Sequence, residues 1–508
     1  MAYLLGLDIG TTGAKALLCD GDGRVLATAM SEYPLSSPFP LWSEQAPADW
    51  WEGAQEALRA VVAQAGVETG GIAALGLTGQ MHGAVFLDER GEVIRPALLW
   101  NDQRTADECR EITARVGAVR LIEIAGNPAL TGFQAPKILW LRNHEPEHYA
   151  RVAQVLLPKD YIRLQLTGES ATDASDAAGT LLLDLRARDW SPEILTALDI
   201  PRVWLPRVYE GPEVTGLLRP DIAAALGQPA GLPVVAGGGD NAAAAIGTGI
   251  VRTGVISSSI GTSGVLFAHS DEIRLDPLGR LHTFCHSVPD RYHLMAVTLS
   301  AGGSFRWFRD LLRQVHPAAQ SLSYNTLTAA AATVPPGAEG LLFLPYLTGE
   351  RTPHLDPLAS GAFVGLTARH GLGHLARAVM EGVVFSMRDG LEIMRQLGLP
   401  RGQIRATGGG ARSPLWRQMQ ADIYGAEVVT LTAEEGPAYG AALLGGVGAG
   451  VFDSVYDAVD RCVAVADVTR PHSLVQPHYE AVYTIYRGLY GALRGTMRDL
   501  AVSASLEV

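Results

Sequence analysis

Short apolar runs that end in glycine-rich turns recur along the chain. In the first, residues 4–9 are apolar apart from Gly6 and Asp8, residues 10–13 read Gly-Thr-Thr-Gly, and residues 14–18 resume the strand pattern. An apolar run of this length predicts a buried strand, and the glycine turn between the two runs predicts a hairpin.

Strand-like and helix-like segments alternate through the rest of the chain. Further strands are predicted at residues 72–78, 232–236, 404–407 and 428–431. Helices are predicted at residues 47–65, 372–394, 414–424 and 436–446, and residues 477–500 are expected to form an amphipathic surface helix without chemistry. This alternation predicts the α/β class.

The first hairpin has a second copy in the middle of the chain. Residues 9–13 align with residues 260–264, Ile-Gly-Thr-Ser-Gly, and an apolar strand follows each. Two such hairpins predict two related halves that face one nucleotide. A chain of 508 residues is long enough for two or three domains, and we expect a boundary that divides it into residues 1–246 and 247–508.

Composition limits the classes of protein that fit. Hydrophobic residues make up 47% and charged residues 18%, as in a folded enzyme, and the net charge of −13 argues against a nucleic-acid partner. The four cysteines have neither metal-ligand nor redox spacing, so free thiols are expected. Because neither a signal peptide nor an apolar run of about 18 residues is seen, we expect a cytoplasmic protein with no membrane partner.

The chemistry of the first turn suits phosphate oxygens. Glycine allows close backbone approach, and Thr11 and Thr12 offer hydroxyl and amide donors. Asp8 ends the preceding strand, and a carboxylate beside a phosphate is repelled unless a cation lies between them, so Mg²⁺ is expected there. The alternative is an ordinary hairpin with an Asp at the end of its strand.

A third glycine turn, at residues 408–413, lies between a predicted strand and a predicted helix. The free amides and positive dipole end of a helix N-terminus favour a phosphate or an adenosine there. The P-loop signature and the protein-kinase catalytic loop are both absent from the sequence. A phosphotransferase of this sequence would therefore hold its phosphates with the paired hairpins.

Candidate acceptor-site residues also follow predicted strands. Asp240 comes after three glycines and is the best candidate for a general base, although it could instead cap the following helix. His82, in the polar segment 79–83, is a candidate for binding a sugar hydroxyl, with a structural histidine as the alternative. Trp100, Asn101 and Asp102 form a further wall of that site or serve packing and capping.

Two other charged groups have structural alternatives. Asp173 and Asp176 lie in a loop of small residues and either help to bind metal or sugar or accept hydrogen bonds from loop amides. Glu350 and Arg351 are expected to form an internal ion pair that supports the site without taking part in catalysis.

Taken together, these segments resemble the FGGY family of carbohydrate kinases over most of the chain. The resemblance is carried by residues 6–13, 41–45, 79–83, 98–102, 157–161, 237–241, 261–264 and 408–413. It implies two actin-like, ribonuclease-H-like domains around a central cleft, with the sugar bound largely by the N-terminal domain and ATP by the C-terminal domain.

The resemblance also implies roles for individual residues. Asp240 would accept the proton of the sugar hydroxyl, and Asp8 would support activity at the Mg²⁺–phosphate site. The expected sugar-binding residues are Met81, His82, Trp100, Asp240 and Asn241. The expected ATP-binding residues are Thr11, Thr12, Gly261, Thr262, Gly409, Gly410 and Ala411.

The implied reaction is ATP-dependent phosphorylation of the terminal hydroxyl of D-xylulose. Members specific for glycerol usually carry an Arg-Glu pair where this chain has Met81 and His82, which argues against glycerol. Ribulose, fuculose and gluconate stay open as substrates. A non-catalytic sugar sensor and a chaperone-type ATPase are alternatives of another class, and a homodimer is the partner state considered.

Overall fold

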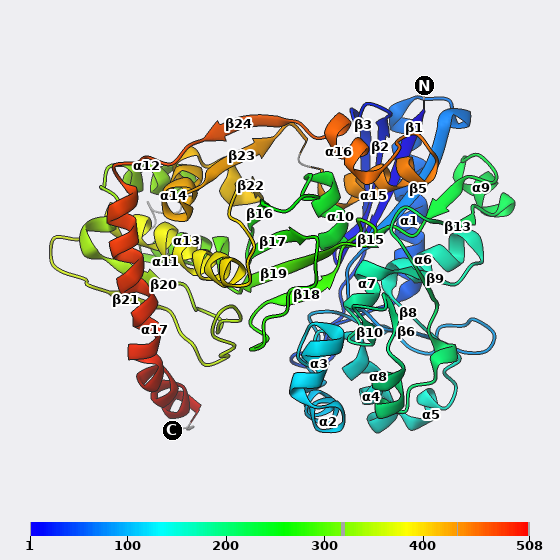
Figure 1. Ribbon diagram of the computed structural model, residues 1–508, viewed down its shortest axis with the longest axis horizontal. Coiled ribbons are helices and arrows are strands. Elements are labelled where there is room, and N and C mark those ends of the chain that lie inside the picture. The colour runs from blue at the N-terminus through cyan, green and yellow to red at the C-terminus, as the bar shows by residue number, and fades with distance from the viewer. Residues whose placement is uncertain (1, 316–320, 434, 506–508) are drawn as a thin grey trace.

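Two large sheets, one in each half of the chain, organise the computed structural model, which describes residues 2–315, 321–433 and 435–505 (Figure 1). The strand order of the first sheet is β13 (Val214–Leu217), β14 (Pro233–Val235), β5 (Ile72–Gly79), β1 (Tyr3–Ile9), β2 (Gly13–Asp20) and β3 (Val25–Glu32), with β15 (Gly238–Gly239) also paired to β5. The order of the second is β18 (His282–Cys285), β19 (Tyr292–Thr298), β17 (Gly264–Ser270), β16 (Val255–Ile260), β22 (Gln403–Thr407), β23 (Glu427–Leu431) and β24 (Val465–Thr469).

The two sheets repeat one topology. In the first, β2 is antiparallel to β1 and to β3, while β5 and β14 continue the sheet in parallel. In the second, β17 is antiparallel to β16 and to β19, while β22 and β23 continue in parallel. The antiparallel strands β13 and β24 then flank β14 and β23. This repetition confirms the two related halves predicted from the duplicated hairpin.

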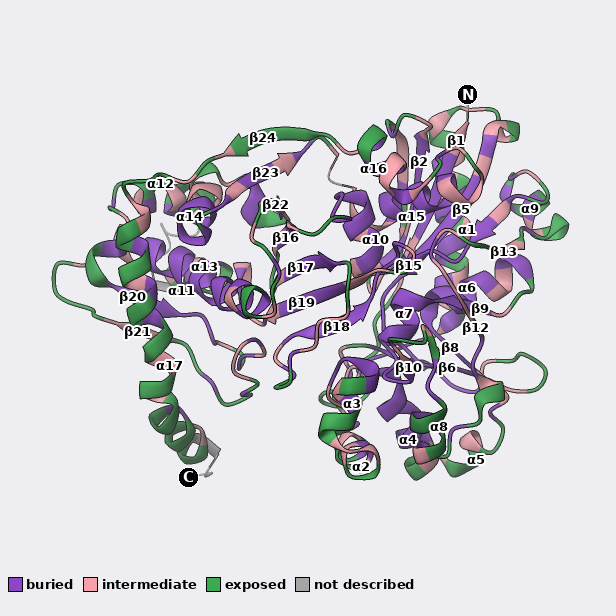
Figure 2. Ribbon diagram, in the orientation of Figure 1, coloured by how far each residue is buried: buried purple, intermediate pink, exposed green. Residues whose placement is uncertain are grey.

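Helices cover these sheets and fill the rest of both halves (Figure 2). In the N-terminal half they are α1 (Pro47–Ala65), α2 (Ala106–Val116), α3 (Ala118–Ala125), α4 (Gln134–His144), α5 (Pro146–Tyr149), α6 (Pro158–Thr167), α7 (Ala174–Ala178), α8 (Pro192–Leu198), α9 (Pro220–Leu226) and α10 (Asp240–Gly247). In the C-terminal half they are α11 (Gly302–Val315), α12 (Tyr324–Ala332), α13 (Leu372–Gln396), α14 (Pro414–Tyr424), α15 (Gly436–Gly448), α16 (Val455–Cys462) and α17 (Gln476–Ser505).

Small strand pairs join the loops around these layers. They are β4 (Glu44–Gln45) with β7 (Ala97–Leu98), β6 (Val85–Leu87) with β8 (Gln154–Leu156), β9 (Ala171–Asp173) with β12 (Arg207–Tyr209), β10 (Leu183–Asp184) with β11 (Asp189–Trp190), and β20 (Leu342–Leu344) with β21 (Ala362–Val364).

The two faces of β1 pack against different helices. Leu5, Leu7 and Ile9 point into a core cluster with residues of α1, whereas Leu4 belongs to a cluster with residues of α15. Gly6 lies on the α15 side, where a Cβ would stand 1.9 Å from the carbonyl oxygen of Ala438. A helix from late in the sequence therefore packs on the first sheet, and the division at residues 246 and 247 stays a prediction.

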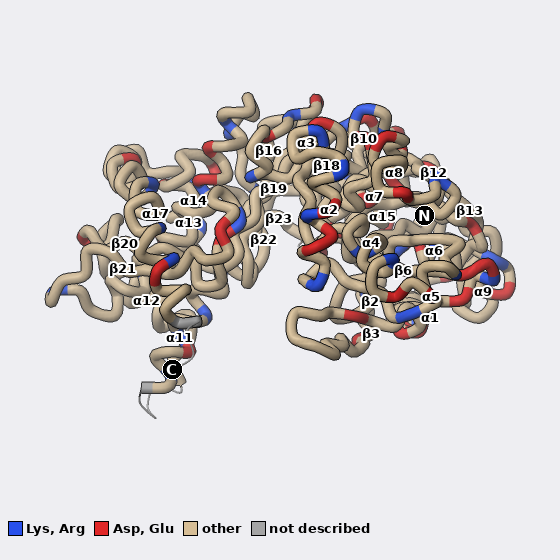
Figure 3. The backbone as a smooth tube through the Cα atoms, turned by 90° about the horizontal axis from the view of Figure 1, so that it is seen from below, with Lys and Arg blue, Asp and Glu red and all other residues tan. Residues whose placement is uncertain are grey.

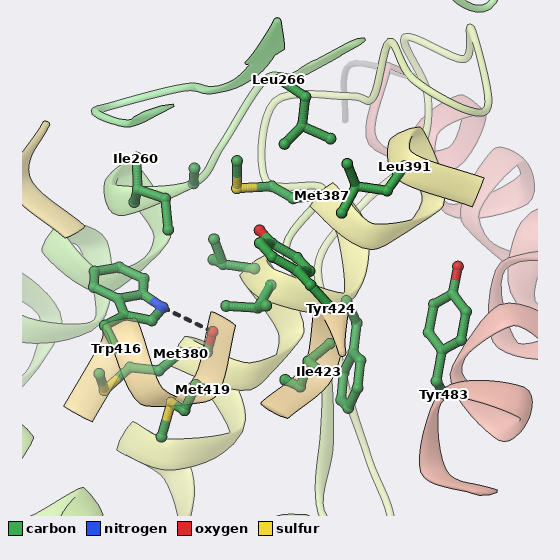
Figure 4. Packing of buried hydrophobic residues seen from close by; sticks show 14 of the residues in the cluster. Ile260, Leu266, Met380, Met387, Leu391, Trp416, Met419, Ile423, Tyr424 and Tyr483 are labelled. Atoms are coloured by element: carbon green, nitrogen blue, oxygen red, sulfur yellow. Dashed lines mark hydrogen bonds between the residues drawn. The ribbon is translucent and has the colours of Figure 1, made fainter. Parts of the chain in front are cut away.

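The second sheet is covered by α13 and α14 through a large apolar cluster (Figure 4). Ile260 of β16 and Leu266 of β17 lie in this cluster with Met387 of α13. The indole N–H of Trp416 on α14 donates to the carbonyl oxygen of Met380, at 3.1 Å. This packing fixes the start of α14, and with it the glycine turn that precedes the helix.

Charged residues of both signs are dispersed over the two halves (Figure 3). Within the described ranges, no helix is long and apolar enough to cross a membrane.

Candidate active site

The position of Asp8 follows from the alternation of side chains along β1. Asp8 lies on the Leu4–Gly6 face of the strand, the α15 side, because successive side chains of a strand alternate between faces. Its Oδ1 is buried without a hydrogen-bond partner. Burial, and to a lesser degree the charge of Asp240, raise the pKa of Asp8 to about 7, while Lys15 opposes both. The two carboxylates are therefore electrostatic neighbours.

Asp240 is the first residue of α10 and follows a tightly packed glycine segment. A Cβ on Gly237 would stand 1.7 Å from the carbonyl oxygen of Leu77, and this glycine has φ 76°, so the segment requires glycine. The half-buried Asp240 carboxylate accepts from the backbone N–H and the side-chain Nδ2 of Asn241, at 2.7 and 2.9 Å. Burial raises the pKa of Asp240 to about 6, and the Asn241 hydrogen bonds limit the rise.

Met81 and His82 form a turn beside this segment. The Met81 side chain is buried, and its atoms would lie 2.8 Å from a Cβ on Gly239. The His82 ring is 2.6 Å from the carbonyl oxygen of Gly179 through Nδ1. Because a carbonyl only accepts, Nδ1 carries the proton and Nε2 is left as an acceptor. Burial, with help from the nearby Lys137, lowers the pKa of His82 to about 3, so the ring is neutral.

The first glycine turn is connected to the same region. The indole N–H of Trp100 donates to Thr11 Oγ1 at 2.9 Å, and the Thr11 hydroxyl donates to Gln80 Oε1 at 3.2 Å. Thr12 is exposed. The hydroxyl of Thr11 is thus engaged with residues of the expected sugar side.

The glycine turns of the second half line a cavity of about 680 Å³. Gly261 and Thr262 come from the β16–β17 turn, and Gly409 and Gly410 come from the turn before α14. Ala411 is buried and does not line the cavity. Residues of α12 supply another wall, among them Thr328, which the sequence did not suggest.

A second cavity, of about 490 Å³, lies between α10 and the second sheet. Asn241, next to Asp240, lines one side of it, and Gly409 lines the other. Arg412 borders both cavities and was missed in the sequence. Two spaces that share Gly409 and Arg412 thus extend from the C-terminal glycine turns to the start of α10.

Comparison with known proteins assigns this arrangement to a family. Residues 3–247 match the N-terminal domain, and residues 256–449 the C-terminal domain, of the FGGY family of carbohydrate kinases. The chain belongs to the FGGY family of carbohydrate kinases. The resemblance stated from the sequence is confirmed, as is the two-domain α/β class.

Two relatives that match this FGGY kinase over almost their whole length are named xylulose kinase. The xylulose kinase of Escherichia coli (strain K12) is 44% identical over 490 residues, 96% of this chain and 99% of its own. The xylulose kinase of Bacillus subtilis (strain 168) is 39% identical over 490 residues, 96% of this chain and 97% of its own.

Solved structures match the whole fold. A xyloylose kinase from Brucella ovis is 38% identical, with a TM-score of 0.91, over 97% of this chain and 100% of that chain. A gluconate kinase from Lactobacillus acidophilus is 26% identical, with a TM-score of 0.92, over 98% of this chain and 99% of that chain.

Membership of this kinase family implies ATP as a substrate, and the residues of the site fit an accompanying Mg²⁺ ion. Among the described residues, no group of three or more His, Cys, Asp or Glu side chains could hold a metal alone. Mg²⁺ does not need such a cage, since it is usually bound by one or two carboxylates together with phosphate oxygens and water. The buried, unpartnered Oδ1 of Asp8 supplies a carboxylate donor of that kind.

A buried ionic cluster lies next to the glycine segment that precedes Asp240. The ammonium of Lys159 lies 2.6, 2.9 and 3.2 Å from Asp160, Asp173 and Asp176, all fully buried. Asp173 also accepts from the amides of Ser175 and Asp176, in keeping with the loop-amide alternative. The Ser175 hydroxyl accepts from the amide of Gly239 at 3.2 Å, which connects the cluster to the residue before Asp240.

The expected ion pair between Glu350 and Arg351 is wrong. The Glu350 carboxylate accepts from the hydroxyl of Thr298 and from the backbone amides of Leu299 and Arg351. The Arg351 guanidinium instead reaches Nε2 of His282, at 3.4 Å. Within the described residues, no ion pair within 4 Å joins the two side chains, and the Glu350 carboxylate is bound by local hydrogen bonds instead.

The contacts of Asp102 fit a structural role, the second of the two expected for it. It accepts from the amide of Ser43 at 2.7 Å and pairs with Arg104 at 2.6 Å. The neighbouring Trp100 stays 47% exposed and free to contact a ligand.

Proposed function

We propose that this chain transfers the γ-phosphoryl group of ATP to the terminal hydroxyl of D-xylulose, giving D-xylulose 5-phosphate. The observation that carries the proposal is the position of Asp240, a half-buried carboxylate at the start of α10 beside the cavity shared by Asn241 and Gly409. Relatives named xylulose kinase, up to 44% identical over nearly the whole chain, support the choice of sugar.

The sugar is proposed to lie against the Met81–His82 turn. The neutral His82 ring offers Nε2 as an acceptor for a sugar hydroxyl. Trp100 presents a partly exposed indole beside Thr11, which suits an apolar face of the sugar. Met81 packs against Gly239 and so shapes the floor of the site next to Asp240.

The nucleotide is proposed to occupy the cavity of about 680 Å³, with its phosphates directed toward the smaller cavity. Gly409 and Gly410 offer backbone amides without side-chain bulk along this path, while Gly261 and Thr262 line it from the β16–β17 turn. Arg412 borders both cavities, where a guanidinium can stabilise phosphate charge.

In the proposed reaction, Asp240 accepts the proton of the sugar hydroxyl as that oxygen attacks the γ-phosphorus, and ADP leaves. A pKa of about 6 keeps this carboxylate largely ionised at neutral pH and still basic enough to take a proton. Asp8 would hold a Mg²⁺ ion, which when bound neutralises charge on the transferred group. Phosphoryl transfer otherwise depends on positioning, which the packed Gly237–Gly239 segment provides.

A panel of sugars tests this proposal. ADP release is measured with D-xylulose, ribulose, fuculose, gluconate and glycerol, and the highest kcat/KM is expected with D-xylulose. Asp240→Ala should lower kcat by about 10²–10⁴-fold while ATP still binds, because only the proton acceptor is lost. A higher kcat/KM for gluconate would move the assignment to an acid substrate, and full turnover by Asp240→Ala would refute its role as base.

A cytoplasmic location and a homodimeric state stay predictions. Light scattering after size-exclusion chromatography measures the second of these directly.

A further inference from the structure

Lysine is rare in this chain and confined to the active site. Of the 40 Lys and Arg residues only Lys15, Lys137 and Lys159 are lysine. Lys15 stands opposite Asp8 in the β1–β2 pair, and Lys159 anchors the acidic cluster next to Gly239. Lys137 has no role in the reaction described so far. A compact ammonium in a chain that otherwise uses arginine points to a place that a guanidinium does not fit.

The environment of Lys137 is unusual for a cation. The side chain is fully buried on α4, and its Nζ donates to the backbone carbonyl oxygens of His82, at 2.8 Å, and of Gly132. Within the described residues, no carboxylate lies within 4 Å of this ammonium. Burial lowers the pKa of Lys137 to about 7. Its hydrogen bonds therefore serve the main chain and no counter-ion.

The His82 carbonyl that Lys137 binds belongs to a strained turn. His82 has φ 69°, and the Gly83 N–H donates to the Met81 carbonyl oxygen at 2.9 Å, which closes a three-residue turn. A turn of this kind at a residue other than glycine is rare and strained. One turn earlier on α4, Gln134 Nε2 donates to the carbonyl oxygen of Gly83, at 2.8 Å. Two consecutive carbonyls of the turn are thus bound by one face of α4.

We propose that Lys137 is a positioning residue, whose ammonium holds the His82 carbonyl so that the strained turn presents the imidazole Nε2 to the sugar. Without this donor the buried carbonyl has no partner, and the cheapest relief is a rotation of the His82–Gly83 peptide out of the left-handed region. That rotation moves the ring away from its bond to Gly179. The inference rests on the proposed function in that His82 binds the sugar.

The test compares Lys137→Met with the wild-type protein in two assays. Hydrogen exchange of the Gly83 amide, followed by mass spectrometry, is expected to be at least about tenfold faster in the variant, because the hydrogen bond to Met81 opens more often. The KM for the sugar is expected to rise about tenfold or more while the KM for ATP and sugar-independent ATP hydrolysis stay within about twofold. Arg274→Met, which loses a comparable bond to the Leu397 carbonyl, is the control and should change neither readout.

A double-mutant cycle separates positioning through His82 from a general loss of structure. Glycine adopts φ 69° without strain, so Lys137→Met is expected to add little to the sugar KM of His82→Gly. Additive effects in the cycle, or unchanged Gly83 exchange and sugar KM in Lys137→Met, would overturn the inference. If Lys137→Met does not fold, Lys137→Gln is used, because its amide keeps N–H donors. This variant should show a smaller increase in both Gly83 exchange and the KM for the sugar.

A different result would refute the proposed function itself. If the wild-type protein phosphorylates another sugar of the panel, D-xylulose is the wrong substrate, and the Lys137 comparison is made with the sugar that is turned over. If no sugar is turned over, the proposed function fails, and the exchange of the Gly83 amide still decides whether Lys137 holds the turn.

Discussion

The crossing of α10 and α15 connects Asp240, the proposed base, to the packing between the two helices. α10 begins with Asp240, and one turn later the carbonyl oxygen of Ala243 faces Gly440 of α15. A Cβ on Gly440 would stand 1.7 Å from that oxygen and 2.8 Å from the backbone nitrogen of Gly247. Since both neighbours are backbone atoms, no side-chain rotation relieves the clash. Gly440→Ala must therefore push the two helices apart.

The size of this effect follows from the distances. An ordinary contact begins at 3.4 Å, so the helices must separate locally by about 1.7 Å at Gly440. Overpacking of this kind costs about 1–3 kcal/mol of the free energy of unfolding. Because a shift of about 1 Å in a catalytic group can cost about 10²-fold in rate, we expect Gly440→Ala to lower kcat by about 100-fold.

The assay measures ADP release and urea unfolding on the same preparations. Gly495→Ala is the matched control, because this glycine also lies in a helix, α17, but a Cβ there has nothing within 4 Å. It should leave kcat unchanged and raise the free energy of unfolding by up to about 1 kcal/mol, since alanine loses less backbone freedom. A Gly440→Ala protein with wild-type kcat and stability would refute the reasoning.

Of three further predictions, two concern pH and one concerns the nucleotide cavity. Burial raises the pKa of Asp8 to about 7, so between about pH 4 and 7 the folded protein keeps a proton that the unfolded chain has lost. The free energy of unfolding, measured by urea titration without ligands, should therefore fall as the pH rises through this range. The fall should be smaller in Asp8→Asn than in the wild-type protein. The rate of ADP release should rise with pH up to about pH 7, as Asp8 ionises. Lys15→Met should move this rise to higher pH, because Lys15 lowers the pKa of Asp8. A pH–rate profile that does not shift in Lys15→Met would contradict this prediction. Ala329→Phe adds bulk to an exposed wall of the 680 Å³ cavity and should raise the KM for ATP about tenfold or more without changing the KM for the sugar. An equal rise in both KM values would refute the proposal that the nucleotide binds in that cavity.

Much of the local structure could be predicted because it depends on short-range patterns. The helix expected at residues 47–65 is α1, and the one expected at residues 414–424 is α14. The sequence repeat at residues 9–13 and 260–264 falls on the equivalent turn of each sheet. The expected roles of the site residues remain predictions, although the structure brings Asp8 and Asp240 together.

Other features could not be predicted because they depend on pairs of distant residues. Lys15 meets Glu435 at 2.6 Å across 420 positions of sequence, and no local pattern specifies that pair. Lys159 lies in residues 157–161, whose pattern indicates no role for the lysine, and only the fold buries it with three aspartates. Glu350 and Arg351 are adjacent in sequence, yet their side chains have separate partners.

By itself, the sequence of this FGGY kinase determined where strands end in glycine turns and which acidic residues follow or close those strands. Periodicity and the conformational freedom of glycine act over a few residues, so they can be read along the chain. Only the tertiary structure decided that α15 packs on the first sheet, that the His82 turn is held by α4, and that the half-buried carboxylates of Asp8 and Asp240 interact electrostatically. Packing and desolvation set these outcomes, and both depend on which distant segments exclude water from one another.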